Sequence, residues 1–197
     1  GYYTIADRTD GVLKVLRSYQ FEAVRAIYDK VVQHRDWTNP DQQLGGYIWH
    51  TTGSGKTMSS FKAAQLIAMS GSADKVVFVV DRIELGTQSA REYRNFSGVD
   101  EEIQETEDTD VLVAKLRSTD VADTLIVTSI QKLAIIADDE QRRHILQESR
   151  PARLVFIVDE CHRSTFGESY ASIKAAFPTA LFFGFTGTPL LRENRRT

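Results

Sequence analysis

The chain is organised around the stretch Gly45-Gly46-Tyr47-Ile48-Trp49-His50-Thr51-Thr52-Gly53-Ser54-Gly55-Lys56-Thr57-Met58, an apolar strand that runs into a glycine-rich turn and then a helix. Gly53 and Gly55 allow successive backbone N–H groups to face one concavity, and the helix that begins near Lys56 offers its positive end to an anion. The Lys56 ammonium can reach the outer phosphates of a nucleotide, and the Thr57 hydroxyl can ligate Mg²⁺. The stretch therefore predicts a phosphate cradle.

The cradle departs from the general template G-x-x-x-x-G-K-[ST] at one position, because His50 stands where the template has glycine. Its context is otherwise complete, since apolar residues precede the turn and a helical pattern over 57–69 follows it. The alternative is a structural turn that binds no nucleotide. We expect seven consecutive residues to contact the nucleotide: Thr52, Gly53, Ser54, Gly55, Lys56, Thr57 and Met58.

Composition sets limits on the function. The chain has 197 residues, 42% of them hydrophobic and 26% charged, which is enough to bury a substantial core in one domain. A net charge of -3 gives no general affinity for nucleic acid, so any such binding needs a local surface. Cys161 is the only cysteine, which excludes an intramolecular disulfide and indicates a packing role, with a redox role as the alternative.

The ends of the chain indicate a piece of a longer protein. Residues 1–15 carry little pattern and form a lead-in, 16–190 form the domain, and 191–197 read as a truncated linker. The beginning of the chain lacks a secretory pattern, and no apolar run approaches the roughly 18 residues of a membrane span. We therefore expect a cytoplasmic protein without a membrane partner.

Apolar runs alternate with helical patterns along the domain. Uninterrupted runs at 75–80, 124–128, 154–158 and 180–185 predict buried strands, in addition to the strand before the cradle. Spacings of three and four predict a helix to about residue 34 with Ser18 as its N-cap, and further helices at 57–69, 83–96, 111–117, 131–136, 141–148 and 168–177. Residues 100–110 are an acidic stretch that we interpret as a solvated connection. The pattern predicts a three-layer α/β fold with a mostly parallel sheet and helices on both faces.

Four polar segments follow predicted strands. In parallel sheets, ligands bind beyond the carboxyl ends of the strands, so the segments at 50–57, 81–82, 159–162 and 186–189 should line one edge. Asp159 would hold Mg²⁺ through coordinating water, and Glu160 would position the attacking water. Together with Lys56, these two carboxylates predict catalysis of ATP hydrolysis, with ATP and Mg²⁺ as cofactors.

Each of the remaining polar residues near this edge has more than one possible role. His162 could be a zinc ligand or a general base, but a catalytic polar contact that senses the γ-phosphate or links to the next motif suits it better. Thr186 and Thr188 could couple to that cluster through their hydroxyls, or they could simply end a strand. The Gln20 amide could donate to and accept from an adenine edge at once, which would select ATP over GTP. A glutamine at a helix start is more often just exposed.

Six motifs in order resemble those of the first RecA-like motor domain of a superfamily 2 helicase or translocase. That resemblance implies a P-loop, RecA-like form of the predicted fold, and it carries the adenine role of Gln20. The motifs are Arg17-Ser18-Tyr19-Gln20 (the Q motif), residues 49–57 (motif I), 80–88 (motif Ia), 127–133 (a second DNA-side motif), Asp159-Glu160-Cys161-His162 (motif II) and Thr186-Gly187-Thr188-Pro189 (motif III).

Within that superfamily the chain resembles the motor (R, or HsdR) subunit of type I restriction-modification enzymes over about 16–190. The resemblance rests on Trp-His before the cradle, Val-Asp-Arg-x-Glu-Leu, Ser-Ile-Gln-Lys-Leu, Asp-Glu-Cys-His-Arg-Ser and Gly-Phe-Thr-Gly-Thr-Pro-Leu. That family commonly has histidine at the position of His50. The resemblance implies ATP-driven translocation of double-stranded DNA, in a complex with methylation and specificity subunits.

The resemblance also implies what the chain contacts and what it lacks. DNA contacts, mainly to phosphates, are expected around Asp81, Arg82, Thr128 and Gln131, although a structural salt bridge suits Arg82 as well. We find no nuclease motif before residue 16 and no second motor lobe with an arginine finger after 197. Because such a finger contributes roughly 10³ to 10⁵ in rate, the chain alone should hydrolyse ATP slowly if at all.

Two rival functions remain open. One is the same lobe in an RNA helicase or a DNA-repair helicase, which would differ in the nucleic acid that stimulates ATP hydrolysis. The other is a nucleotide-binding scaffold or regulatory module that never turns over.

Overall fold

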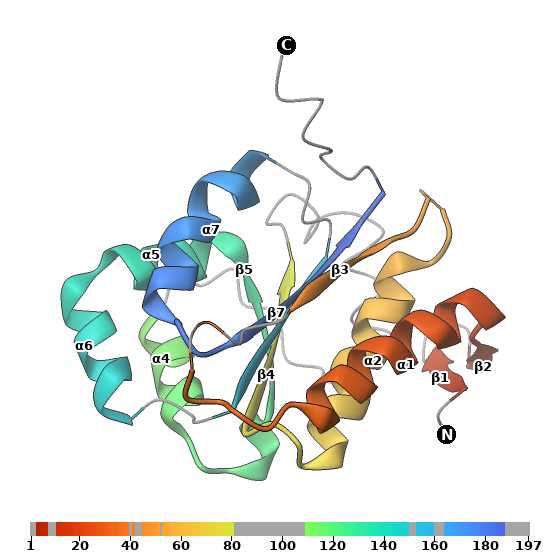
Figure 1. Ribbon diagram of the computed structural model, residues 1–197, viewed down its shortest axis with the longest axis horizontal. Coiled ribbons are helices and arrows are strands. Elements are labelled where there is room, and N and C mark those ends of the chain that lie inside the picture. The colour runs from red at the N-terminus through yellow and green to blue at the C-terminus, as the bar shows by residue number, and fades with distance from the viewer. Residues whose placement is uncertain are drawn as a thin grey trace.

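The computed structural model describes residues 3–7, 11–39, 41, 45–51, 53–80, 109–149, 153–159 and 164–187. Within these ranges a five-stranded parallel sheet lies between two layers of helices (Figure 1). The sheet contains β3 (Gly46–Trp49), β4 (Lys75–Val80), β5 (Leu125–Ser129), β6 (Leu154–Val158) and β7 (Leu181–Thr186), in the spatial order β3-β7-β6-β4-β5. The predicted three-layer α/β fold is thereby confirmed.

The strand sequences account for their places in the sheet. Every residue of β4 and of β6 is buried, as expected for strands covered on both faces. The edge strand β3 instead leaves Tyr47 65% and Trp49 60% exposed, and only Ile48 packs into the core. The strand that carries the cradle is therefore paired on one side only, with β7.

Two hydrophobic cores lie on opposite faces of the sheet. On one face, α1 (Ser18–Gln33) and α2 (Lys56–Ser70) cover apolar side chains of β4, β6 and β7, including Phe78 and Phe185. On the other, α4 (Thr109–Arg117), α5 (Ile130–Asp138), α6 (Glu140–Ser149) and α7 (Ser164–Ala176) pack over side chains such as Phe156. Both layers are visible in Figure 1, where α1 and α2 lie on the right and the other helices on the left.

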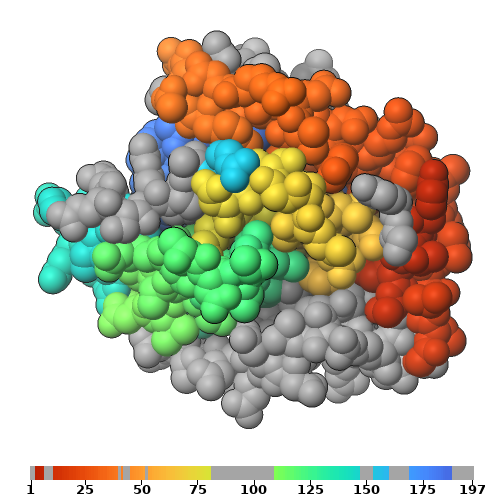
Figure 2. All heavy atoms as spheres, turned by 90° about the horizontal axis from the view of Figure 1, so that it is seen from below, coloured from red at the N-terminus to blue at the C-terminus, as the bar shows by residue number. Residues whose placement is uncertain are grey.

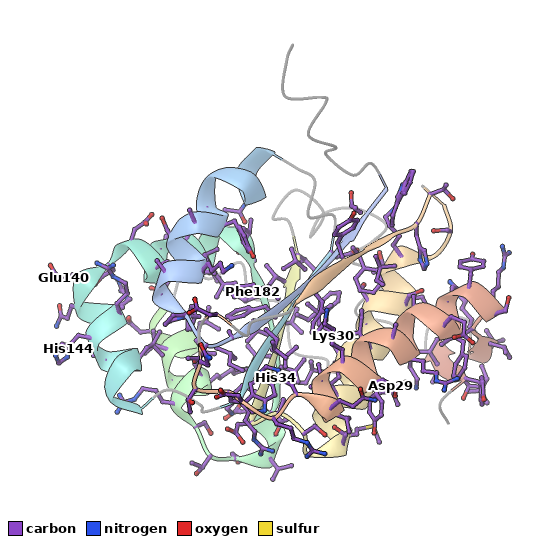
Figure 3. The ribbon with its side chains drawn as sticks, viewed as in Figure 1. Asp29, Lys30, His34, Glu140, His144 and Phe182 are labelled. Atoms are coloured by element: carbon purple, nitrogen blue, oxygen red, sulfur yellow. The ribbon has the colours of Figure 1, made fainter. Side chains whose placement is uncertain are left out.

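The start of β3 is held closely against β7. An added Cβ at Gly45 would overlap the carbonyl oxygen of Phe182, so no residue with a side chain fits there. From the other side, Lys30 Nζ donates to the Gly45 carbonyl at 2.8 Å. Figure 3 labels Lys30 on α1 and Phe182 on β7. Because Gly45 lies directly ahead of the strand that leads to the cradle, this contact fixes where the cradle begins.

The opposite end of the sheet is held by polar contacts. Figure 2 views this end, where the segments leading into β4 (yellow), β5 (green) and β6 (blue) meet. Arg153 donates to both carboxylate oxygens of Asp74, through its backbone N–H at 2.9 Å and through its guanidinium at 2.6 and 3.0 Å. Lys75 Nζ donates to the Asp123 carbonyl at 2.7 Å, next to the short 3₁₀ helix η3 (Val121–Asp123). These contacts lie at the amino ends of the strands, whereas the cradle lies at the carboxyl edge of the sheet.

Some details differ from the sequence-based expectations. Residues 4–7 and 12–15 form an antiparallel hairpin, β1 (Thr4–Asp7) and β2 (Val12–Val15), where we expected no structure. Helix α1 has Arg17, not Ser18, as its N-cap. Helix α7 begins at Ser164, ahead of the predicted residue 168. The predicted helix at 83–96 and the acidic stretch up to residue 108 lie outside the described residues.

No helix among the described residues is both long enough and apolar enough to cross a membrane.

Candidate nucleotide site

The cradle is the turn between β3 and α2. Gly53 and Gly55 both have φ near 76°, a backbone conformation that residues with a Cβ rarely adopt. Gly55 is the N-cap of α2, and Lys56 is its first residue, with only 6% of its surface exposed. The N-terminal end of α2 therefore faces the turn, as anion binding requires. Met58, one of the predicted contact residues, packs its side chain against the core.

A hydrogen bond joins the cradle to the end of β6. The Thr57 hydroxyl donates to Asp159 Oδ2 at 2.8 Å, and the backbone N–H of Asp159 donates to the Val79 carbonyl at 3.0 Å. Asp159 is 3% exposed, so its carboxylate is largely removed from water. Two of the four predicted edge segments, at 50–57 and 159–162, thus meet at this hydrogen bond.

The chemistry of this pair suits magnesium and a nucleotide. A hydroxyl and a carboxylate oxygen are hard ligands of the kind that Mg²⁺ takes beside phosphates. The Ser54 hydroxyl oxygen is buried and has no hydrogen-bond partner among the described residues. A buried polar atom without a partner is costly, so a ligand with polar oxygens would complete the turn. The residues present therefore fit a phosphate group with its metal ion.

The beginning of α1 packs directly on the cradle. Gln20 Nε2 donates to the carbonyl of Ser54 at 2.9 Å and to that of Gly55 at 3.3 Å. The hydroxyl of Tyr19 donates to the same Ser54 carbonyl at 2.9 Å. Gln20 is 2% exposed, so it is not the solvent-facing residue that a helix start usually carries, and its amide faces the turn. Adenine recognition by Gln20 stays a prediction.

His50 fills the space that glycine leaves open in the general template. Its ring lies edge-on to the Tyr19 ring, with ring centroids 5.2 Å apart. It also lies edge-on to the Phe185 ring, with ring centroids 6.4 Å apart. Its Nδ1 is buried without a hydrogen-bond partner among the described residues. Burial, and then the nearby Lys56 ammonium, lower the pKa of His50 below its usual value, because both disfavour the imidazolium. His50 is therefore a neutral packing residue under the cradle at neutral pH.

The end of β7 lies beside the cradle as well. The backbone N–H of His50 donates to the Thr186 carbonyl at 3.0 Å, and Trp49 Nε1 donates to the Gly187 carbonyl at 3.0 Å. Thr186, one of the two predicted coupling residues, is 3% exposed. The other, Thr188, lies outside the described residues. A conformational change at the end of β7 would reach the cradle through these two hydrogen bonds.

The predicted DNA-side residues that the structure describes belong to β5 and α5. Thr128 is buried near the end of β5, and Gln131 is in the first turn of α5. Strand β5 is at the opposite edge of the sheet from β3, so these residues are separated from the cradle by three strands. Six predicted site residues lie outside the described part of the chain: Thr52, Asp81, Arg82, Glu160, His162 and Thr188.

Sequence reasoning missed two residues of this site. Tyr19 belongs to a predicted motif but has no predicted role, and His50 is in the sequence only a departure from a template. The signal for Tyr19 is its place next to Gln20 in the same predicted motif. The packing of His50 against Tyr19 depends on tertiary contact, which the sequence does not report.

Comparison with known proteins agrees with this geometry. Solved structures share the RecA-like fold: the Sulfolobus solfataricus SWI2/SNF2 ATPase core in complex with dsDNA has a TM-score of 0.54 at 15% identity, over 99% of this chain and 35% of that one. A nuclease-deletion mutant of the Type ISP restriction-modification enzyme LlaGI has a TM-score of 0.58 at 20% identity, over 91% and 18%. Fold and cradle together define a RecA-like α/β domain with a glycine-rich turn between β3 and α2.

Sequence relatives narrow the class. The family model described as SWI2/SNF2 ATPase matches residues 19–197. A type I restriction enzyme endonuclease subunit of Staphylococcus aureus is 40% identical over 98% of this chain, which spans 19% of that protein. The C-terminal part of a putative type I restriction enzyme endonuclease subunit from Mycoplasma pneumoniae is 40% identical over 86% of this chain and 82% of its own length. The chain therefore belongs to the SWI2/SNF2 ATPases, in the family of type I restriction enzyme endonuclease subunits.

Proposed function

We propose that this chain is the ATP-binding motor lobe of a type I restriction enzyme R subunit and contributes to translocation of double-stranded DNA before cleavage. The observation that carries the proposal is the Thr57–Asp159 hydrogen bond, since it brings a phosphate-binding turn and a buried carboxylate to one point. ATP hydrolysis needs those two groups together. The Staphylococcus aureus and Mycoplasma pneumoniae relatives support the restriction context.

Each residue of the site has a proposed role. Lys56 binds the outer phosphates, while Thr57 and Asp159 hold Mg²⁺, Asp159 through coordinating water. When bound, the metal ion neutralises phosphate charge. Glu160 orients the water that attacks, and His162 makes the polar contact that follows it. The amides from Thr52 to Met58 bind the phosphates, and Thr186 with Thr188 transmits the state of the site to the rest of the protein.

The rest of the activity belongs to a larger protein. This chain spans 19% of the length of the Staphylococcus aureus relative, so cleavage, site recognition and methylation are proposed for other parts and subunits. A second motor lobe would supply an arginine finger, which contributes roughly 10³ to 10⁵ in rate. Alone, the chain would bind ATP and turn it over very slowly.

Duplex DNA is the proposed polymer substrate. The Sulfolobus solfataricus relative by fold was solved in complex with dsDNA, and this chain resembles the fold of 35% of that one. We place the contacts at Asp81, Arg82, Thr128 and Gln131, mainly to phosphates. A net charge of -3 gives the chain no general affinity for nucleic acid, so its DNA affinity should be weak and fall steeply with salt.

The test uses the intact protein and compares ATP hydrolysis with duplex DNA, single-stranded DNA and RNA. Strongest stimulation by duplex DNA supports the proposal, and strongest stimulation by RNA favours an RNA helicase. Lys56→Ala should abolish Mg-ATP binding in calorimetry, whereas Lys174→Ala, on the exposed side of α7, should not. Unchanged Mg-ATP affinity of Lys56→Ala would reject the cradle.

Glu160→Gln separates a motor from a module that only binds nucleotide. In a motor, this change stops hydrolysis and leaves Mg-ATP binding nearly intact, because the amide cannot orient and deprotonate the water. If hydrolysis by the intact protein is the same with and without the substitution, Glu160 has no catalytic role. Nucleotide binding without any turnover in the unaltered protein would favour the regulatory module.

A further inference from the structure

Two neighbouring side chains of α1 hold one carbonyl of the cradle. The Tyr19 hydroxyl and Gln20 Nε2 each donate to the Ser54 carbonyl at 2.9 Å. Gln20 Nε2 also donates to the Gly55 carbonyl at 3.3 Å. These bonds connect residues 34 and 35 positions apart, so they are not part of the helix or of the turn itself. The conformation of the turn therefore depends on a separate element.

The hydrogen-bonding capacity of the Gln20 amide is used within the protein. Its Oε1 accepts from the Arg17 backbone N–H at 2.8 Å, and both hydrogens of Nε2 are directed at the Ser54 and Gly55 carbonyls. Only 2% of the residue is exposed. A Cβ added to Gly55 would lie 2.5 Å from Gln20 Nε2, which shows how closely the amide packs on the turn. In this arrangement the amide has no N–H left to donate to a base.

Tyr19 is held in place by His50. The two rings meet edge to face at 89°, and the His50 backbone N–H is bonded to the end of β7. Tyr19 is 39% exposed, so its ring lies at the rim of the site and not in the core. His50 thus packs against the Tyr19 ring while the Tyr19 hydroxyl donates to the Ser54 carbonyl.

We propose that Tyr19 and Gln20 are positioning residues that together form a latch on the Ser54 carbonyl and keep the turn in its phosphate-binding conformation. This proposal rests on the proposed nucleotide binding at the cradle and adds how the cradle is preorganised. Glycine turns have more conformational freedom than other segments, so holding one carbonyl reduces the entropy lost when phosphate binds.

The latch makes a prediction that distinguishes it from recognition of the base. It acts on the phosphate-binding turn, so its loss should weaken every ligand that carries the phosphate chain, whatever base is attached. Inorganic triphosphate has no base at all. A base-reading glutamine would affect ATP relative to GTP and leave inorganic triphosphate unchanged.

The experiment compares Tyr19→Phe and Gln20→Glu in the intact protein. Tyr19→Phe removes only the hydroxyl. Gln20→Glu keeps the acceptor for Arg17 but places an oxygen where an N–H donated to Ser54. Affinities are measured for Mg-ATP, Mg-GTP and Mg-triphosphate, each in competition with a fluorescent ATP analogue. Matched controls are Tyr47→Phe, on the exposed side of β3, and Gln33→Glu, at the exposed end of α1.

We expect Tyr19→Phe to bind all three ligands roughly fivefold more weakly, as the loss of one hydrogen bond predicts. Gln20→Glu loses the bonds to both Ser54 and Gly55, so its affinities should fall at least as much. The ATP-to-GTP ratio should stay unchanged, and KM should rise with little change in kcat, since the latch holds the turn equally in both states. In the double variant the losses should not add, because both donors hold one acceptor. Both controls should bind the three ligands like the unaltered protein, and Tyr19→Phe should keep its thermal unfolding midpoint, because Tyr19 is 39% exposed.

Three outcomes would overturn the latch. One is an altered ATP-to-GTP ratio in Gln20→Glu with unchanged triphosphate affinity, which would assign the base to Gln20. Another is unaltered affinity for all three ligands in Tyr19→Phe. This outcome would overturn the latch even if Gln20→Glu fails to fold. The third is failure of the unaltered protein to bind triphosphate or Mg-ATP, which would reject the proposed function itself and is recognised before any variant is made.

Discussion

The Thr57 hydroxyl donates to Asp159 Oδ2 at 2.8 Å, although the two residues are 102 positions apart in the chain. Asp159→Asn keeps the size of the side chain and an acceptor for Thr57, but it removes the negative charge that attracts a metal ion. We expect Mg-ATP affinity to fall roughly 10- to 100-fold, as for other residues that orient a metal's bound water. Calorimetry with magnesium and with a chelator measures the difference.

The informative quantity is the difference between the nucleotide affinity measured with magnesium and that measured with chelator. Nucleotide binding in chelator should change little in Asp159→Asn, because the phosphate contacts remain. Asp29→Asn on α1 is the control, since its carboxylate is half exposed and pairs only with Arg25 among the described ion pairs. An equal loss of affinity with and without magnesium would show that Asp159 supports the fold and not the metal.

Protonation of His50 should destabilise the protein. Burial and the Lys56 ammonium lower its folded-state pKa, so the unfolded chain takes up the proton more readily. The stabilisation from neutral His50 is therefore complete above its ordinary pKa, about 6.5, and is lost as pH falls below it. The rings of Tyr19 and Phe185 also face His50.

Chemical denaturation between about pH 7.5 and pH 5 tests this prediction. His50→Gln should show a flatter loss of stability with acid than the unaltered protein. His144→Gln is the control, because His144 is exposed on α6. Parallel pH profiles for the unaltered protein and His50→Gln would contradict the assignment.

Gly55→Ala should damage the cradle more than its backbone conformation alone explains. Gly55 and Gly71 both have positive φ, 76° and 68°, so alanine costs about 1 kcal/mol of strain at either position. Only at Gly55 would the new methyl meet another group, Gln20 Nε2 at 2.5 Å, whereas Gly71 faces open space. We expect equal or greater loss of unfolding free energy at Gly55, and loss of Mg-ATP affinity there alone.

Comparing the two variants isolates the contact with Gln20. Thermal or denaturant unfolding gives the stability difference, and calorimetry gives the affinity difference. If Gly71→Ala lowered Mg-ATP affinity as much as Gly55→Ala, the effect would come from general destabilisation.

Lys62→Met should stabilise the domain. Lys62 is 4% exposed on α2, and its ammonium donates a hydrogen bond to Gln65 Oε1 at 3.0 Å. Burial lowers the pKa of Lys62, because an ammonium is costly to remove from water. Methionine has a similar length without the charge, so the free energy of unfolding should rise by about 1 kcal/mol.

The pH dependence gives a second readout for Lys62. With a lowered folded-state pKa, the unfolded chain binds more protons in the alkaline range, so stability should rise with pH towards about 10.4. Lys62→Met should lack that rise, while Lys174→Met on the exposed side of α7 should keep it. A decrease in stability of Lys62→Met would mean that the ammonium is matched by a favourable contact.

The sequence predicted the sheet because each central strand is a continuous apolar run. It predicted that residue 57 and residue 159 would meet, because carboxyl ends of parallel strands share one edge. The spatial order β3-β7-β6-β4-β5 could not be read in this way, since pairing depends on which apolar faces fit. The roles of the predicted site residues remain to be measured.

The β1–β2 hairpin was missed for a physical reason. Its strands are four residues each, and Leu13 and Val15 are 70% and 66% exposed, so the apolar alternation does not mark a buried face. Only Ile5 of the hairpin is in the core. Among the described residues between the two strands, Gly11, with φ near 64°, is a local signal of the turn.

The hairpin lies directly ahead of the residues that hold the cradle. The Leu16 backbone N–H donates to the Tyr3 carbonyl, and the Tyr3 ring stacks on Phe21, so the hairpin is fastened to both sides of Tyr19 and Gln20. A force that displaces the hairpin would thus be transmitted to the Ser54 carbonyl within one helical turn. If the cradle binds nucleotide as proposed, the position of the hairpin would therefore set how tightly it does so.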